Sequence, residues 1–371
     1  MNFQDYIQDV SWGGLQESIQ DKTRGEAELA LVSDRKTFSD LLALLSPAAS
    51  GLIEDMAQEA HRLTRQRFGR VIQMYAPIYI SSECANACVY CGFNRHNTIR
   101  RATLSLEEVD READALLKAG FRHVLLLTGE SPRHVGVEYL GSIASRLREK
   151  FSSIGIEVYP MDIDSYRSLI DSGVDSLTVY QETYKRSCYE AIHPAGPKRD
   201  YDWRLDTPDR GGRAGFRRLN IGALLGLAEW RVEGAFLAMH AAYLMKNYWK
   251  SHVSVSFPRL RPAAGGYEPA FPVGDADMVQ LMCALRLFLP DAGLVISTRE
   301  PRELRDNLVP LGITHMSAGS KTAPGGYVSH CDYEGQFDVD DRRSPSEVAE
   351  MIKAKGYVPV WKDWDSAFLQ R

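Results

Sequence analysis

The stretch Ser81-Ser82-Glu83-Cys84-Ala85-Asn86-Ala87-Cys88-Val89-Tyr90-Cys91-Gly92-Phe93 lies directly behind an apolar run that begins at Val71. Its three cysteines are separated by only three and two residues, so their thiolates can bind one metal centre from a single loop. Three such ligands on a four-iron, four-sulfur (4Fe-4S) cluster leave one iron without a protein ligand. That iron can take a small molecule, and S-adenosylmethionine suits it through its amino and carboxylate groups.

This cysteine spacing resembles the signature of the radical S-adenosylmethionine superfamily, in which an aromatic residue, here Tyr90, precedes the third cysteine. The resemblance implies a 4Fe-4S cluster held by Cys84, Cys88 and Cys91, with S-adenosylmethionine on the remaining iron and Tyr90 beside the cofactor. Two other interpretations stay open. A zinc site could recruit His96 as its fourth ligand, and clustered cysteines can also be ordinary buried side chains.

The composition is that of a globular protein that needs no disulfides. The chain has 371 residues, of which 44% are hydrophobic and 25% charged, so it can bury a large core. A net charge of −5 argues against a nucleic-acid partner. Because no run is long enough to span a membrane and the start lacks an export signal, we expect a cytoplasmic protein. Cys188, Cys283 and Cys331 are scattered, so no second cluster is expected.

From Val71 onward, apolar strands alternate with helices, which indicates a parallel sheet covered on both faces. Strands are expected over residues 71–80, 122–128, 156–160, 176–180, 219–225, 253–257, 293–297 and 313–317. Eight such strands predict an α/β fold of the (βα)8 TIM-barrel type, and an open doubly wound sheet is the alternative. We expect a helical extension over residues 1–70, the barrel over 71–320, and a C-terminal loop, helix and tail over 321–371 that close it. Residues 181–218 are expected to be a long polar segment.

Polar residues follow the ends of the expected strands, where a barrel places its active groups. Thr128, Gly129 and Glu130 follow the second strand. The glycine permits close approach of a ligand, and the two side chains can accept hydrogen bonds from an ammonium group. By resemblance to the superfamily, this motif holds the amino group of S-adenosylmethionine, although a turn before a helix often contains the same residues.

The same resemblance assigns three further residues to this cofactor. Glu182, after the fourth strand, is expected to bind ribose hydroxyls, and Arg204 the methionine carboxylate. Leu224, between two glycines on the fifth strand, is expected to pack against adenine. A surface salt bridge is the alternative for Glu182 and Arg204, and an ordinary core strand is the alternative for Leu224.

Longer stretches resemble one family in particular. They are Tyr75–Ser81, Val179–Tyr184, Arg204–Arg210, Val255–Pro262 and Trp361–Asp365. The chain is thereby identified as a member of the tyrosine lyases of thiamin thiazole biosynthesis. The resemblance implies cleavage of the Cα–Cβ bond of L-tyrosine to 2-iminoacetate and 4-cresol, with formation of methionine and 5'-deoxyadenosine.

By family position, Arg299 holds the substrate carboxylate, and Tyr79 and Ser317 lie near the amino-acid end of the substrate. For Tyr79, a strand-end aromatic packed in the barrel is the alternative. The family also implies flavodoxin or ferredoxin as electron donor and thiazole synthase as partner. A lyase acting on tryptophan and a non-catalytic metal-binding scaffold remain open. The histidines, His123 among them, are expected to be structural without a carboxylate partner, and Asp338–Arg343 to be a solvated loop.

Overall fold

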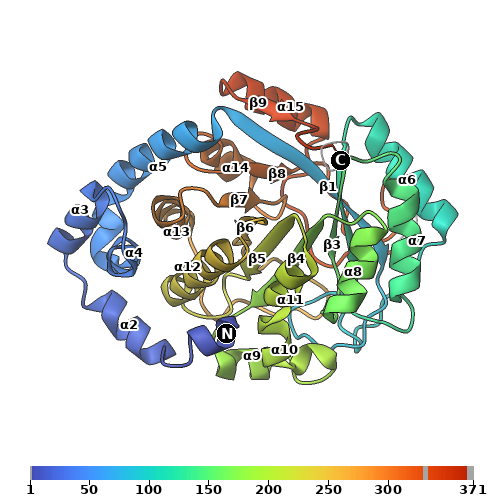
Figure 1. Ribbon diagram of the computed structural model, residues 1–371, viewed down its shortest axis with the longest axis horizontal. Helices are drawn as coiled ribbons and strands as arrows, with labels where there is room; N and C mark the ends of the chain where they lie inside the picture. Colours follow the sequence, from blue (N-terminus) through green and yellow to red (C-terminus); the bar gives the residue numbers. More distant parts are fainter. Residues whose placement is uncertain (1, 329–332, 366–371) are drawn as a thin grey trace.

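The computed structural model describes residues 2–328 and 333–365, so Cys331 lies outside the described residues. Eight parallel strands form a closed barrel at its centre (Figure 1). They are β1 (Val71–Ser81), β2 (His123–Thr128), β3 (Ser153–Glu157), β4 (Ser176–Glu182), β5 (Arg218–Ala223), β6 (His252–Ser256), β7 (Gly293–Ile296) and β8 (His315–Ser317). Because β1 pairs with both β2 and β8, the sheet has no break. The barrel prediction is confirmed, and the doubly wound alternative is wrong.

Helices cover the outside of the barrel. They are α6 (Leu106–Lys118), α7 (Val137–Leu147), α8 (Ile163–Asp171), α11 (Thr207–Ala214), α12 (Trp230–Asn247), α13 (Asp275–Phe288) and α14 (Arg302–Leu308). Local sequence sets their limits. The Ser105 hydroxyl accepts a hydrogen bond from the Glu108 amide at the start of α6. Gly120, with φ of +100°, follows the end of the same helix.

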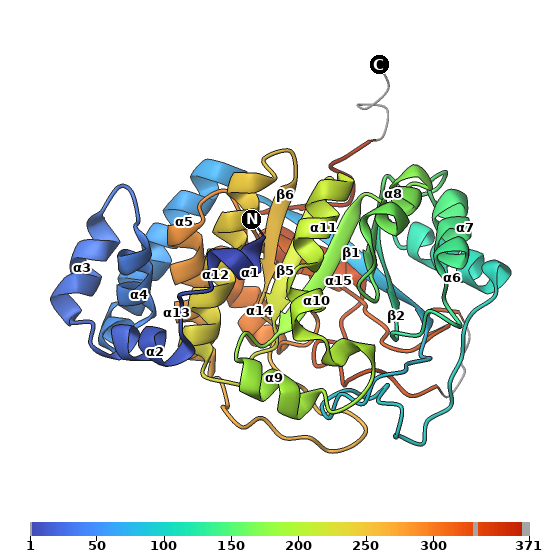
Figure 2. The same ribbon diagram turned by 60° about the horizontal axis from the view of Figure 1, so that its bottom comes forward.

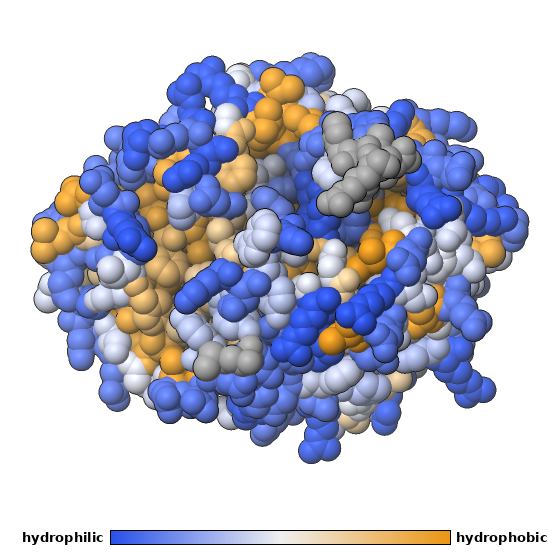
Figure 3. All heavy atoms as spheres, in the orientation of Figure 1, coloured by the Kyte–Doolittle hydropathy of each residue, from blue (hydrophilic) through white to orange (hydrophobic). Residues whose placement is uncertain are grey.

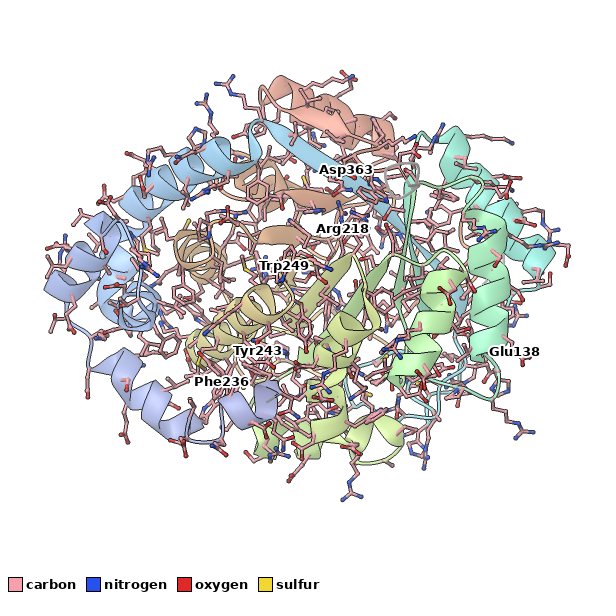
Figure 4. All side chains as sticks on the ribbon, viewed as in Figure 1. Glu138, Arg218, Phe236, Tyr243, Trp249 and Asp363 are labelled. Atoms are coloured by element: carbon pink, nitrogen blue, oxygen red, sulfur yellow. The ribbon has the colours of Figure 1, made fainter. Side chains whose placement is uncertain are left out.

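The N-terminal residues add a second helical layer on one side. This layer comprises α1 (Phe3–Tyr6), α2 (Trp12–Gln20), α3 (Arg24–Val32), α4 (Phe38–Leu45), the 3-10 helix η1 (Pro47–Leu52) and α5 (Ile53–Phe68). Residues 2–70 contain no strand, as predicted. Phe236 and Tyr243 of α12 face this layer (Figure 4), and Trp12 stacks on Phe236 with ring centroids 5.8 Å apart. Apolar residues all around α12 are explained by this double cover.

Two pairs of exposed apolar side chains stand out. Leu29 and Val32 are exposed on α3, and Val71 and Val358 near the start of β1. Figure 3 shows orange areas at the left and top of the face in view, a broad paler apolar area over its left half, and polar residues over much of the remainder. Among the residues described, no helix combines the length and apolar character needed to cross a bilayer.

The polar segment 181–218 is more regular than the sequence suggested. It contains α9 (Arg186–Ile192), the 3-10 helix η2 (Pro197–Arg199), α10 (Tyr201–Leu205) and α11. Two of its arginines do not point into solvent, because Arg204 and Arg210 are both buried. Asp341 likewise lies buried against Arg305 and Arg343, so the prediction of a solvated loop over Asp338–Arg343 is wrong there. Long-range ion pairs, Arg204 with Glu130 and Arg305 with Asp341, turn part of these charged stretches inward.

The C-terminal segment reaches the amino end of the strands. After α15 (Pro345–Ala354), strand β9 (Val358–Val360) pairs with the start of β1. The carboxylate of Asp363 then accepts from the Gln73 amide at 2.8 Å and from Arg218 at 2.9 Å (Figure 4), and lies 3.0 Å from His123 Nε2. His123 therefore has a carboxylate partner, contrary to the prediction. The boundaries expected at residues 70 and 320 stay predictions.

Candidate functional site

The cysteine loop lies at the carboxyl end of the strands, opposite the C-terminal tail (Figure 2). Four of its backbone N–H groups donate to segments that are distant in sequence. The pairs are Ala85 to Glu130 O at 2.9 Å, Ala87 to Ala195 O at 3.0 Å, Val89 to Ile192 O at 3.1 Å and Gly92 to Gln336 O at 3.0 Å. The loop is therefore held from several sides before any cofactor binds.

Two glycines allow this close packing. A Cβ atom on Gly129 would overlap the carbonyl oxygen of Glu83 in the cysteine loop. A Cβ atom on Gly196, which has φ of +98°, would overlap the side chain of Asn86. The first of these glycines was predicted to make room for a ligand, and in the structure it makes room for the loop that carries Cys84.

The thiols form a donor set that fits an iron–sulfur cluster. Burial raises the pKa of Cys84 and Cys88, and raises that of Cys91 to about 11. Ionising such buried thiols requires a nearby cation, which iron supplies directly. The Gln336 amide lies 3.7 Å from Cys91 Sγ as a hydrogen-bond donor, and the backbone N–H of Asn86 faces the sulfur of Cys84. Such donors stabilise a thiolate ligand.

The zinc interpretation has no corresponding site. His96 is exposed, and its Nε2 accepts from Arg95 Nε at 3.3 Å. Within the described ranges, no three His, Cys, Asp or Glu side chains come close enough together to hold a single metal ion. A cluster differs in this respect, because each thiolate binds its own iron and the sulfurs need not converge on one point.

A buried network of four charged residues lies beside the loop. Arg204 NH1 donates to Glu130 at 2.7 Å, and Lys198 Nζ to Glu182 at 2.6 Å. Arg204 NH2 lies 3.7 Å from Glu182, which links the two pairs. Burial by itself raises the pKa of Glu182, but Lys198 and Arg204 together lower it below its usual value. Glu182 also has φ of +69°, a strained conformation that its two cationic partners stabilise.

The structure thus brings together the polar residues predicted to bind S-adenosylmethionine. Arg204 is paired with Glu130 and Glu182, so these three form one unit rather than separate contacts. The buried Thr128 hydroxyl has no hydrogen-bond partner among the described residues, which fits an ammonium group of a ligand. Tyr90 and Leu224 lie together in a small apolar cluster suited to an adenine ring. The individual roles of these residues stay predictions.

The barrel encloses a cavity that opens at its mouth. All three residues predicted for the substrate, Tyr79, Arg299 and Ser317, line it. The Arg299 guanidinium lies 3.3 Å from the ring centroid of Phe337 and forms no ion pair with any described residue. Ser317 Oγ accepts from the Thr298 amide at 3.1 Å.

Two cavity residues were missed by the sequence analysis. Gln336 accepts a hydrogen bond from Tyr79 OH at 2.8 Å and donates to Cys91 Sγ, so it joins the cavity to the cysteine loop. No local motif marks it. Glu157, at the end of β3, also lines the cavity, and burial together with the nearby Glu182 raises its pKa to about 7. A glutamate within an apolar strand was the available signal.

The comparisons with known proteins agree with this geometry. The model of the radical SAM superfamily matches residues 78–236, and that of the biotin and thiamin synthesis associated domain matches residues 256–358. The chain is 46% identical to the 2-iminoacetate synthases of Escherichia coli K12 and Salmonella typhimurium LT2, over 98% of its length and 97% of theirs. HydG, a maturase of the FeFe-hydrogenase, superposes with a TM-score of 0.90 at 30% identity, covering 98% of this chain and 84% of HydG.

A closed parallel barrel with three cysteines in the loop after its first strand defines a radical S-adenosylmethionine enzyme, which uses a 4Fe-4S cluster and S-adenosylmethionine. Methylornithine synthase shares this fold, with a TM-score of 0.73 at 20% identity over 90% of this chain and 97% of that one. The chain belongs to the family of the 2-iminoacetate synthases, which are carbon–carbon lyases.

Proposed function

We propose that this chain cleaves the Cα–Cβ bond of L-tyrosine, giving 2-iminoacetate and 4-cresol for thiamin thiazole synthesis. S-adenosylmethionine is converted to methionine and 5'-deoxyadenosine, and the reaction takes up two electrons and one proton. The observation that carries this proposal is the placement of Arg299. It is a guanidinium without an ion pair among the described residues, and it lines the cavity that Gln336 connects to Cys91.

When bound, the cluster and S-adenosylmethionine supply a reagent that abstracts a hydrogen atom from the substrate. The chain's own residues position the two molecules. Arg299 binds the tyrosine carboxylate through two parallel hydrogen bonds, and its stacking on Phe337 fixes the plane of the guanidinium. The free Thr128 hydroxyl and the Glu130 carboxylate bind the ammonium group of S-adenosylmethionine.

Exclusion of water is the second task of the site, because water competes with reactive species. Tyr79 and Phe337 line the cavity beside Arg299. The Tyr79 hydroxyl is engaged by Gln336 at 2.8 Å. This contact joins β1 to the segment that follows the barrel, and the same glutamine reaches Cys91 of the cysteine loop.

Two partners follow from the chemistry. A flavodoxin or ferredoxin supplies the electrons, since both are small one-electron carriers. A thiazole synthase consumes 2-iminoacetate, because a free imine hydrolyses in water and must be used soon after release. L-tyrosine is the substrate, and neither a nucleic acid nor a membrane takes part.

The test is an anaerobic assay of the reconstituted protein with a strong reductant, S-adenosylmethionine and either tyrosine or tryptophan. We expect about four irons per chain, formation of 5'-deoxyadenosine, and 4-cresol from tyrosine only. The Cys88→Ala variant should lose both the cluster absorbance and 5'-deoxyadenosine formation. Bound zinc without iron would reject the proposal, and 5'-deoxyadenosine without 4-cresol would reject tyrosine as the substrate.

A further inference from the structure

We propose that the carboxylate of Glu157 binds the phenol hydroxyl of the substrate and thereby selects tyrosine over aromatic amino acids that lack a donor at the far end of the ring. This inference rests on the proposed function, because it assigns the ring end of the same substrate whose carboxylate Arg299 binds. Both residues line one cavity.

The strand register places Glu157 deeper in the barrel than Tyr79 and Arg299. Tyr79 pairs with Leu127 of β2, and Leu127 pairs with Glu157 of β3. Strands of an eight-stranded barrel are tilted, so a row of paired residues descends as it passes from strand to strand. Arg299 follows the end of β7, at the mouth. A substrate held by Arg299 therefore extends its side chain toward the level of Glu157.

The tilt is visible in the remaining pairings. The row continues from β4 to β7 through Thr178, Asn220, Ser254 and Gly293. Val295 of β7 pairs with His315 of β8, and His315 pairs with Gln73 of β1. Gly293 lies two residues before Val295, so the row that contains Gly293 returns to β1 before Gln73, near the start of the strand. Each step around the barrel from Tyr79 thus leads further from the mouth.

Glu157 has no hydrogen bond or ion pair to any residue in the described part of the chain. Leaving a carboxylate unpaired in a protein interior is costly, and such groups are usually paired or used. Burial and the nearby Glu182 raise its pKa, although Arg299, Lys198 and Arg204 oppose this rise. The Glu157 carboxylate is therefore free to accept a hydrogen bond from a ligand, since no described residue of the protein occupies it.

Three tyrosines, Tyr75, Tyr79 and Tyr180, share the cavity with Glu157. The Tyr79 hydroxyl donates to Gln336 at 2.8 Å, and none of the three hydroxyls donates to Glu157. Burial raises the pKa of all three tyrosines, and the charge of Glu157 adds to that rise. The Glu157 carboxylate is thus left as an acceptor for a phenol that the described residues do not supply.

A carboxylate is well suited to this task. A hydrogen bond from a phenol to a carboxylate is charge-assisted and roughly twice as strong as one between neutral groups. A site built around such a bond discriminates strongly against an analogue without the hydroxyl, because the buried acceptor is then left unpaired. Phenylalanine is that analogue for this chain.

The experiment measures binding without turnover. Anaerobic, reconstituted enzyme with S-adenosylmethionine and no reductant is titrated calorimetrically with L-tyrosine and with L-phenylalanine. The wild-type protein should bind tyrosine at least about 100-fold more tightly than phenylalanine. In Glu157→Leu this ratio should fall below about tenfold, with the phenylalanine affinity unchanged. In Glu157→Gln the ratio should fall about tenfold, since the charge is lost but a neutral hydrogen bond remains.

The matched control is Glu190→Gln, because Glu190 is exposed on α9 and lies outside the cavity; it should change neither affinity. An undiminished ratio in the glutamine and leucine variants would overturn the assignment. Equal loss of both amino acids would also overturn it, since that outcome indicates a general structural role. If the leucine variant does not fold, the glutamine variant decides. Whether wild-type enzyme forms 4-cresol tests the proposed function separately.

Discussion

Replacing Glu157 by glutamine should stabilise the protein at alkaline pH. The carboxyl of an unfolded chain ionises near 4.5, and burial raises the pKa of Glu157 to about 7. Between these values the folded state binds more protons than the unfolded state. The free energy of unfolding therefore falls as the pH rises through this window. Glutamine has nearly the same shape and no charge, so the variant lacks this loss.

The magnitude follows from the size of the shift. Each pKa unit corresponds to about 1.4 kcal/mol, so the full cost of ionising Glu157 in the folded protein is about 3 kcal/mol above pH 8. At pH 5.5 the advantage of Glu157→Gln should shrink to about 1.4 kcal/mol, because only the first pH unit above the unfolded-state pKa has then been crossed. Four charged groups set this value: Glu182, which raises the pKa, and Arg299, Lys198 and Arg204, which lower it.

The assay is anaerobic urea unfolding of the wild-type protein, Glu157→Gln and the exposed control Glu190→Gln at the two pH values. The control should match the wild type at both. A glutamine variant that is less stable than the wild type at pH 8, or whose advantage does not change with pH, would contradict the placement of an unpaired, partly buried carboxylate at this position. Groups kept for function at the expense of stability are common in active sites.

Three further changes probe other parts of the site. Arg299→Ala should raise KM for tyrosine by about 100-fold, the loss of a two-point charged contact, while leaving iron content unchanged; a parallel loss of iron would refute the role given to Arg299. Gly129→Ala should prevent cluster incorporation, because its Cβ would overlap the Glu83 carbonyl oxygen. The matched control Gly136→Ala, with only one ordinary contact at 3.5 Å, should retain the cluster, and equal iron contents would disprove the steric argument. Asp363→Asn should lower the free energy of unfolding by about 1.5 kcal/mol, since a partly screened carboxylate that binds Arg218 is lost; urea midpoints that coincide with the wild type would speak against that bond.

Several features were within reach of sequence reasoning because their signals are local. The alternation of strands and helices predicted the barrel, and the cysteine spacing predicted the loop that can hold the cluster. Thr128, Glu130, Glu182 and Arg204 could be proposed for the site because they follow strand ends or match a family motif, and their roles stay predictions. Each of these signals depends only on neighbouring residues along the chain.

The contacts that complete the site were out of reach because they join distant parts of the chain. Gln336 meets Cys91 from 245 positions away in a loop without periodicity. Asp363 meets His123 across the floor of the barrel, which explains why His123 was wrongly expected to lack a carboxylate.

The sequence by itself determined the closed barrel, the position of the cysteine loop and the family, since strand alternation and cysteine spacing are properties of short segments. Only the tertiary structure decided that Arg204, Glu130 and Glu182 form one charged unit, and that Glu157 is left without a partner among the described residues. The physical reason is that burial and charge pairing depend on which strands and loops meet when the barrel closes. A residue's pKa and partners are therefore set by neighbours that the linear order of the chain does not reveal.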